Sequence, residues 1–349
     1  MSNETQWVGG SHPFRPITPS YIAAVSNRMC FYPIYGAAYM NTLSRLRRAV
    51  KSPVLFARHA NRLYHRRFNR RAYNPAGSDV FAEDWDTLVI LDACRYDMFE
   101  RHAELPGRLE HRYTRGTDTT EFLMANFDGR DLRDTVYVTA NPQLHHNREA
   151  IDADLHSVID VWREDGWDEE HGTVLPETVT EYALEAAREY PNKRLVVHYI
   201  QPHYPFIGAE TDFDKRHLAA AGTDDRRAEN LWGQLMTGAL DVTPTDIWEP
   251  YVKNLKRTLP HVRTLLSELD GRTVVTADHG NMLGERSFPI PIREWGHPRG
   301  IYTEQLARVP WLVHDGPRRE VVAERPESIQ ESVKDETVAD RLKHLGYME

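Results

Sequence analysis

Short apolar runs alternate with amphipathic stretches along most of the chain. Several of these runs stop at an acid, which is typical of buried strands in a parallel sheet. The predicted strands lie at 86–92, 134–141, 194–200, 271–278 and 307–313. Amphipathic segments between them predict helices, including 176–190, where Pro176 suits a first helical position, and about 248–269. The alternation predicts an α/β fold, with a mostly parallel sheet covered by helices on both faces.

The part of the chain before this alternation has a different pattern. Apolar residues at helical spacing run through residues 44–71 and are interrupted at Pro53; they are Leu46, Val50, Leu63 and Phe68. Turn-forming residues follow at 74–77. We therefore expect three parts: a basic helical arm over residues 1–75, an α/β domain over 76–315, and a charged, partly helical tail over 316–349.

Charge divides the chain at the same place. Between Thr5 and Ser78 there are 12 Lys and Arg and no acid, whereas 51 of the 52 acids lie from Asp79 onward. A basic amphipathic segment of this kind can pack on the acidic body, lie on anionic lipid or bind nucleic acid. For residues 44–72 we favour peripheral contact with an anionic membrane, and nucleic acid is the less favoured partner.

The remaining totals exclude several classes of protein. A hydrophobic content of 40% and a charged content of 27% are ordinary for a globular protein. The two cysteines, Cys30 and Cys94, cannot form a disulfide framework or a cysteine-rich zinc site. The sequence shows neither the pattern of a secretory signal nor an apolar run that could span a membrane. We expect a cytoplasmic protein, with peripheral contact at the inner membrane face as an alternative.

Polar residues follow the predicted strands at the edge where α/β sheets bind ligands. Asp92 ends the first strand and suits a divalent cation, although an Asp in this position can equally cap a helix or form a turn. Asp278 and His279 end a later strand and offer one oxygen and one nitrogen ligand, while Gly280 allows close backbone approach. Together these residues predict a metal site.

Four segments resemble the alkaline-phosphatase and sulfatase superfamily, in the order found there. LVILDACRYD (88–97) and TADHG (276–280) are similar to its first and a late metal-binding strand. HYIQPHYPFIG (198–208) resembles the Pro-His-x-Pro segment of sulfatases and of phosphoglycerol and phosphoethanolamine transferases. GHPRGIYTEQLARVPWLV (296–313) resembles their later His-Gly and Arg-Val-Pro strand. The resemblance implies an alkaline-phosphatase-like three-layer fold and a sulfatase-like catalytic domain over 76–315.

The segment RGTDTTEFLMANF (115–127) carries the candidate nucleophile. Asp118 and Glu121 have the spacing of a capping box, which predicts a helix that begins near Asp118 and whose positive end favours an oxyanion. The Thr-x-x-x-Glu-Phe spacing is similar to that of lipoteichoic-acid synthases, and this resemblance makes Thr117 the nucleophile and a fourth metal ligand. Thr119 and Thr120 are the fallback choices. Each of these threonines can also serve only to cap the helix.

Other residues take expected roles around this centre. His203 and His297 are candidates for binding substrate oxygens or for protonating the leaving group. We expect substrate contacts from Arg95, Thr119 and His198. Pairing with an acid remains an equal alternative for Arg95, and simple packing remains one for His198.

Two departures from the sulfatase pattern affect the expected chemistry. The Cys-x-Pro-Ser-Arg pentapeptide of sulfatases does not occur, and Asp92 is followed by Ala93 where many sulfatases have paired acids. A threonine nucleophile with fewer carboxylates favours one zinc or manganese ion, with calcium or magnesium as alternatives.

We expect a metal-dependent hydrolase or transferase of phosphate or sulfate esters that acts through a covalent intermediate. The resemblance suggests a substrate that is glycan- or lipid-linked. The alternatives are a catalytically silent relative, and a protein that uses the basic arm to bind a membrane or nucleic acid.

Overall fold

The computed structural model describes residues 53–163, 166–208, 231–324 and 335–347. All of them belong to one compact unit, Ala49–Glu349. A second unit, Met1–Arg48, lies outside the described residues, together with the predicted helical positions Leu46 and Val50. None of the helices in the described part of the chain is long and apolar enough to cross a membrane.

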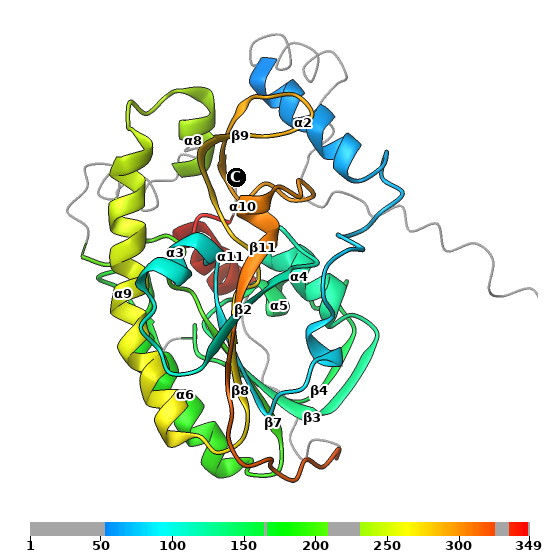
Figure 1. Ribbon diagram of the computed structural model, residues 1–349, viewed down its shortest axis with the longest axis vertical. Coiled ribbons are helices and arrows are strands. Elements are labelled where there is room, and N and C mark those ends of the chain that lie inside the picture. The colour runs from blue at the N-terminus through cyan, green and yellow to red at the C-terminus, as the bar shows by residue number, and fades with distance from the viewer. Residues whose placement is uncertain (1–52, 164–165, 209–230, 325–334, 348–349) are drawn as a thin grey trace, which may run out of the picture. The chain divides into compact units, whose positions relative to one another are not determined.

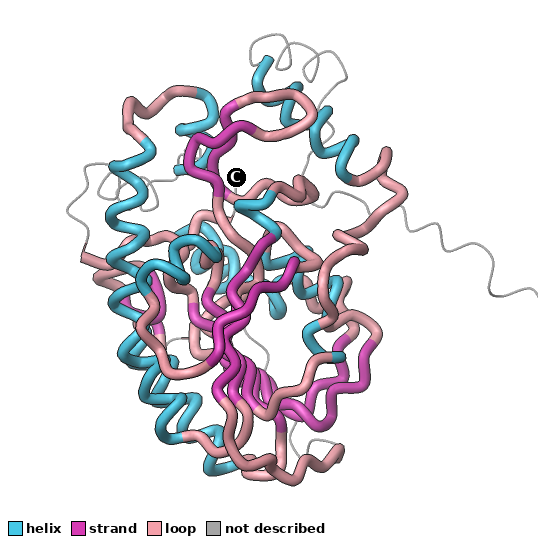
Figure 2. Tube along the Cα trace, viewed as in Figure 1, coloured by secondary structure: helices cyan, strands magenta, loops and turns pink. Residues whose placement is uncertain are grey.

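A seven-stranded sheet forms the centre of the described unit (Figures 1 and 2). Its strands, in spatial order, are β2 (Arg108–Tyr113), β11 (Arg308–His314), β8 (Thr273–Thr276), β1 (Thr87–Leu91), β7 (Arg194–Tyr199), β3 (Arg130–Thr139) and β4 (Ala153–Asp160). The five strands from β8 to β4 are parallel, whereas β11 runs antiparallel to both of its neighbours. The prediction of a mostly parallel α/β sheet is therefore confirmed, with an antiparallel pair at one edge.

Helices and two short hairpins surround this sheet. They are α2 (Pro53–His65), the 3₁₀ helix η1 (Val80–Ala82), α3 (Tyr96–His102), α4 (Thr119–Asn126), α5 (Gln143–His146), α6 (Pro176–Glu189), α8 (Leu231–Thr237), α9 (Pro244–Glu268), α10 (Glu304–Ala307), α11 (Asp335–His344), β5 (Trp167–Asp168) with β6 (Thr173–Val174), and β9 (Met282–Arg286) with β10 (Arg293–Gly296). Helix α6 packs on β7 and β3 and against α9.

Strand β1 shows how the core is divided between the two faces of the sheet. Its side chains alternate: Val89 and Leu91 join an apolar cluster with α6 and α9, whereas Leu88 and Ile90 join a second cluster with α4 and η1. Every residue of β1 is buried. Because both faces are covered, the strand is continuously apolar, and this explains why the sequence pattern predicted it.

Two edge strands and the start of one helix differ from the sequence prediction. Strands β2 and β4 were not predicted, because they lie at the edges and are partly exposed, so their sequences are too polar to show a strand pattern. Helix α9 begins at Pro244 instead of near residue 248. The reason is a capping box, in which Thr243 and Asp246 each bond the other's backbone N–H.

The helix predicted over the basic arm ends earlier than its apolar spacing suggested. Helix α2 ends at His65, and Arg67, Phe68 and Asn69 all have positive φ, which ends helical geometry. Phe68 is 79% exposed and so does not continue the apolar face of α2. The prediction that Phe68 belongs to this helix is therefore wrong.

Helix α2 packs on the body of the protein. Asn61 is fully buried, and its amide donates to Ser287 Oγ at 2.8 Å and to Ile290 O at 2.9 Å. The same side chain accepts a hydrogen bond from the Ile290 N–H at 2.8 Å. Arg58 forms an ion pair with the buried Glu294. The described part of the basic arm thus makes specific contacts with β10 and with the loop that joins β9 to β10.

Substituting Asn61→Ala should lower the free energy of unfolding by about 1–3 kcal/mol, because it removes the three hydrogen bonds of a fully buried amide and leaves the Ile290 N–H without this acceptor. Urea unfolding of the full chain measures this. His59→Ala is the matched control, since His59 is exposed on the same helix and its loss should change stability by no more than about 0.5 kcal/mol. Equal effects of the two substitutions would contradict this role of Asn61.

Candidate functional site

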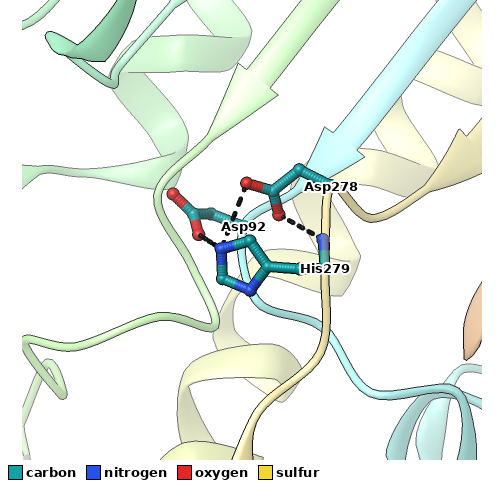
Figure 3. Close-up of side chains that lie close together, drawn as sticks. All are labelled: Asp92, Asp278 and His279. Carbon is teal, nitrogen blue, oxygen red and sulfur yellow. Dashed lines mark hydrogen bonds and ion pairs between the residues drawn. The ribbon is translucent and has the colours of Figure 1, made fainter. Parts of the chain in front are cut away.

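Three of the predicted ligands meet at the carboxyl ends of two neighbouring strands. Asp92 follows β1, and Asp278 and His279 follow β8, which pairs with β1 in parallel. All three residues are fully buried. Figure 3 shows the His279 imidazole beside the two carboxylates, and the candidate ligand atoms lie within 4.8 Å of one another.

In each of the two carboxylates, one oxygen accepts at least two hydrogen bonds from backbone or side-chain groups. Asp278 Oδ1 accepts from the backbone N–H of Ala93 at 3.0 Å and from that of the following residue at 2.8 Å. Asp92 Oδ2 accepts from the Asn141 amide at 2.7 Å and from the Tyr347 hydroxyl. Asp92 Oδ1, by contrast, is buried and has no hydrogen-bond partner among the described residues. This unpartnered oxygen suits a cation.

The His279 ring presents one nitrogen to the carboxylates. Its Nδ1 donates to Gly280 O at 2.8 Å. Nε2 lies 3.4 Å from Asp278 Oδ2 and 3.6 Å from Asp92 Oδ1. A histidine that donates one ring nitrogen to a backbone carbonyl and directs the other at acidic side chains is a typical arrangement for a metal ligand.

The charges at this site also suit a cation. Burial and the neighbouring Asp278 charge raise the pKa of Asp92 well above its usual value. Two carboxylates buried together are unfavourable unless one is protonated or a positive charge lies between them. One imidazole nitrogen and two carboxylate oxygens are ligands that zinc and related divalent ions accept. The residues present therefore fit the predicted metal.

The threonine that reaches these ligands is Thr119. Its Oγ1 lies 2.8 Å from Asp278 Oδ2, 3.5 Å from Asp92 Oδ2 and 3.4 Å from His279 Nε2. Thr119 is the first residue of α4, whose N-cap Asp118 accepts a hydrogen bond from the backbone of the third helical residue, as the spacing predicted. A hydroxyl group therefore lies at the start of a helix and beside all three candidate ligands.

Thr117 lies elsewhere in the same segment. Its Oγ1 lies 3.1 Å from Glu121 Oε2 and 3.2 Å from Pro298 O, and it accepts from the Gly300 N–H at 2.9 Å. Thr120 instead donates to Gln143 at 3.0 Å. The structure thus brings Thr119 to the ligand residues, and places the hydroxyls of Thr117 and Thr120 in other hydrogen bonds.

The buried Glu121 connects α4 to other parts of the chain. Its Oε1 accepts from Arg66 at 2.8 Å and from the Tyr302 hydroxyl at 2.9 Å. Its Oε2 accepts from the Thr117 N–H at 2.9 Å and from the Gly300 N–H at 3.3 Å. One carboxylate therefore joins the nucleophile segment, the loop after β10 and the chain just beyond α2.

His203 and His297 lie next to the ligand histidine. Their Nε2 atoms are 2.9 Å apart, and the His297 ring stacks on His279 with centroids 4.7 Å apart. The Nδ1 of His203 lies 2.6 Å from Tyr204 O, so its Nε2 accepts the hydrogen bond from His297. Burial lowers the pKa of His203 to about 4 and the pKa of His297 well below its usual value. Both rings are therefore neutral near pH 7.

Arg95 and His198 are held by protein groups. The Arg95 guanidinium bonds Asp97 at 2.7 and 2.9 Å and Glu285 at 2.5 Å, which is the pairing alternative for this residue. His198 on β7 has Nδ1 2.7 Å from the Tyr137 hydroxyl and Nε2 3.8 Å from Asp278 Oδ2, and burial lowers its pKa to about 4. Substrate contact by Arg95 and His198 stays a prediction.

The sequence analysis missed two residues of this site. Asn141 is the last residue of the predicted strand 134–141, on the edge that carries the ligands, so its position was a usable signal. Tyr347 lies in the predicted charged tail, and nothing in the sequence pattern connected it to the site.

No family model and no curated protein matches the chain. Three solved structures that it resembles are phosphoethanolamine transferases. The lipooligosaccharide transferase EptA of Neisseria meningitidis is 12% identical, with a TM-score of 0.41 over 66% of this chain and 47% of that chain. The periplasmic domain of Escherichia coli EptC, in complex with Zn, is 13% identical, with a TM-score of 0.42 over 69% and 75%. That of Campylobacter jejuni EptC is 12% identical, with a TM-score of 0.38 over 65% and 77%.

All three structures are phosphoethanolamine transferases, which is one of the enzyme types that the sequence motifs resemble. This chain spans about half the length of EptA.

Asn254 of α9 fixes the loop that carries His203. It is fully buried, its Nδ2 donates to His203 O at 3.0 Å and to Pro205 O at 2.9 Å, and its Oδ1 accepts from the Ile207 N–H at 2.9 Å. Asn254→Ala should therefore lower the free energy of unfolding by about 2 kcal/mol or more, as measured by urea unfolding. Thr264→Ala, at an exposed position of the same helix, should stay within about 0.5 kcal/mol of the parent protein. A small effect of Asn254→Ala would mean that the loop that carries His203 keeps its conformation without these hydrogen bonds.

Proposed function

We propose that this protein is a metal-dependent enzyme that transfers or hydrolyses phosphate or sulfate esters, with Thr119 as its nucleophile. The observation that carries the proposal is the Thr119 hydroxyl, which is buried at the start of α4 and lies 2.8–3.5 Å from polar atoms of three candidate metal ligands. A scaffold without chemistry has no need to bury two carboxylates, an imidazole and a hydroxyl together. The motif resemblance supports the same class of reaction.

Four atoms would hold the ion: Asp92 Oδ1, Asp278 Oδ2, His279 Nε2 and Thr119 Oγ1. A mixed nitrogen and oxygen set favours zinc or manganese over calcium or magnesium, which prefer oxygen ligands alone. When bound, such an ion would lower the pKa of the Thr119 hydroxyl and offset negative charge on the transferring group.

The residues of the chain perform the remaining steps. Thr119 Oγ1 forms the new bond to phosphorus or sulfur while the bond to the leaving oxygen breaks, and the leaving oxygen takes up the proton that the Thr119 hydroxyl gives up. The group then rests on Thr119 until water or an acceptor alcohol takes it. The start of α4 supplies backbone N–H groups and a favourable dipole for its oxygens. Oxygen binding or proton donation by His203 and His297 would require that the hydrogen bond between their Nε2 atoms open.

The proposal that the substrate is glycan- or lipid-linked rests on the motif resemblance. A membrane contact through residues 44–72 is a further part of the proposal, as is a place at the inner, cytoplasmic face. Within the described part of that segment, Arg58 and Arg66 form ion pairs with Glu294 and Glu121. Lipid contact would therefore fall to the more exposed Arg67, Arg70 and Arg71.

Thr119→Ala should abolish turnover of aryl phosphate monoesters, aryl phosphate diesters or aryl sulfates, whichever the protein accepts, with a loss of about 10³-fold or more. Thr119→Ser keeps the hydroxyl and should retain activity to within about tenfold. Chelation should remove the activity, and zinc or manganese should restore it.

The same assay distinguishes the two threonines. Thr117→Ala keeps the proposed nucleophile and should leave measurable turnover, with any loss arising from the changed Glu121 contacts. If Thr117→Ala is inactive and Thr119→Ala active, the nucleophile is Thr117. A protein that stays inert on every ester after metal is added back contradicts the enzyme and favours a silent, ligand-binding relative.

A further inference from the structure

A tyrosine from the C-terminal segment reaches the centre of the candidate site. The Tyr347 hydroxyl donates a hydrogen bond to Asp92 Oδ2, accepts one from the Asn141 amide at 2.9 Å, and lies 3.2 Å from Thr119 Oγ1. Its ring stacks on the His203 ring, with an angle of 11° between the planes and 4.9 Å between the centroids. Tyr347 therefore contacts a candidate ligand, the proposed nucleophile and a histidine of the site at once.

The segment that carries Tyr347 is packed into the protein. Helix α11 lies against α5 (Figure 1). Val338, Leu342 and Leu345 are at most 2% exposed and belong to the larger apolar cluster of the core. Arg341 pairs with Glu169 at 3.0 Å and lies over the Trp167 ring. The position of the Tyr347 hydroxyl is thus set by a docked helix and its following turn.

The hydrogen bonds of Asn141 and Tyr347 converge on one oxygen. One N–H group of the Asn141 amide donates to Asp92 Oδ2 at 2.7 Å, and the other donates to the Tyr347 oxygen at 2.9 Å. The Tyr347 hydroxyl in turn donates to the same Asp92 oxygen. Oδ2 therefore receives both bonds, whereas Oδ1 receives none and faces His279 Nε2 at 3.6 Å. Rotation of the Asp92 carboxylate would break both bonds and expose the wrong oxygen to the site.

We propose that Tyr347 is a positioning residue of the metal site, which acts with Asn141 to hold Asp92 so that Oδ1 faces the ion. The C-terminal segment 335–347 is then part of the active centre. This inference rests on the proposed function, because it requires an ion at Asp92, Asp278 and His279. Groups that hold a metal-ligating side chain in place typically contribute about 10–100-fold to metal affinity or activity.

The test compares zinc binding by the metal-free full-length protein and its Tyr347→Phe variant, using titration calorimetry. This substitution removes the hydroxyl and keeps the ring that stacks on His203. The dissociation constant for zinc should rise by about 10–100-fold, and turnover of the accepted aryl ester should fall through kcat more than through KM. Tyr113→Phe is the matched control, because its hydroxyl contacts Glu304 at the surface and its loss should leave zinc affinity unchanged.

Asp92→Asn separates failure of this inference from failure of the proposed function. If the parent protein binds neither zinc nor manganese, the metal site and this inference fall together. A different outcome is that the parent binds zinc, that Asp92→Asn does not, and that Tyr347→Phe binds zinc as tightly as the parent. In that case only the positioning role of Tyr347 is refuted. Tighter zinc binding or faster turnover by Tyr347→Phe would also overturn it, because the phenol would then be competing with the ion or the substrate.

Discussion

The arrangement of the site depends on one electrostatic constraint, the burial of two carboxylates side by side. Asp92 and Asp278 follow adjacent parallel strands in the middle of the sheet, and neither is exposed to water. In a low-dielectric interior, two such negative charges are tolerated only when a proton or a cation lies with them. The groups around them are consistent with this requirement, because backbone and side-chain donors bind one oxygen of each carboxylate and leave the other directed toward His279.

The loops at this edge of the sheet are interlocked by buried polar contacts. Glu121 connects α4 to the loop after β10, and Asn254 connects α9 to the loop that carries His203. Because each of these groups would be costly to bury without its partners, the loops hold one another in register. The nucleophile helix and the histidine pair are therefore positioned by side chains that make no contact with the proposed substrate.

The sequence revealed those parts of the fold whose residues are buried on both faces. The interior strands β1, β7 and β8 contain unbroken runs of buried apolar residues, so they were predictable, whereas most residues of the edge strands β2 and β4 are half-buried or exposed and gave no pattern. The ligands Asp92, Asp278 and His279 could be selected because parallel strands that end in polar residues converge at one edge.

The choice between two threonines was beyond sequence reasoning. Both Thr117 and Thr119 lie near the helix start, and a motif spacing taken from relatives favours Thr117. In the structure, the backbone of Asp118 is extended and α4 begins at Thr119, so the two hydroxyls have different partners. The positions of these two hydroxyls depend on tertiary packing, and so does the approach of Tyr347 from a distant part of the sequence. Motif spacing alone predicts neither.

The site draws its parts from widely separated regions of the polypeptide, because Asp92, Asn141, Asp278 and Tyr347 meet there. Contacts between positions so far apart along a chain form only when the intervening loops have closed. The arrangement therefore exists only in the fully folded unit. Local unfolding of residues 335–347 alone would remove one of the two donors at 2.9 Å or less to Asp92 Oδ2 and leave the central sheet in place.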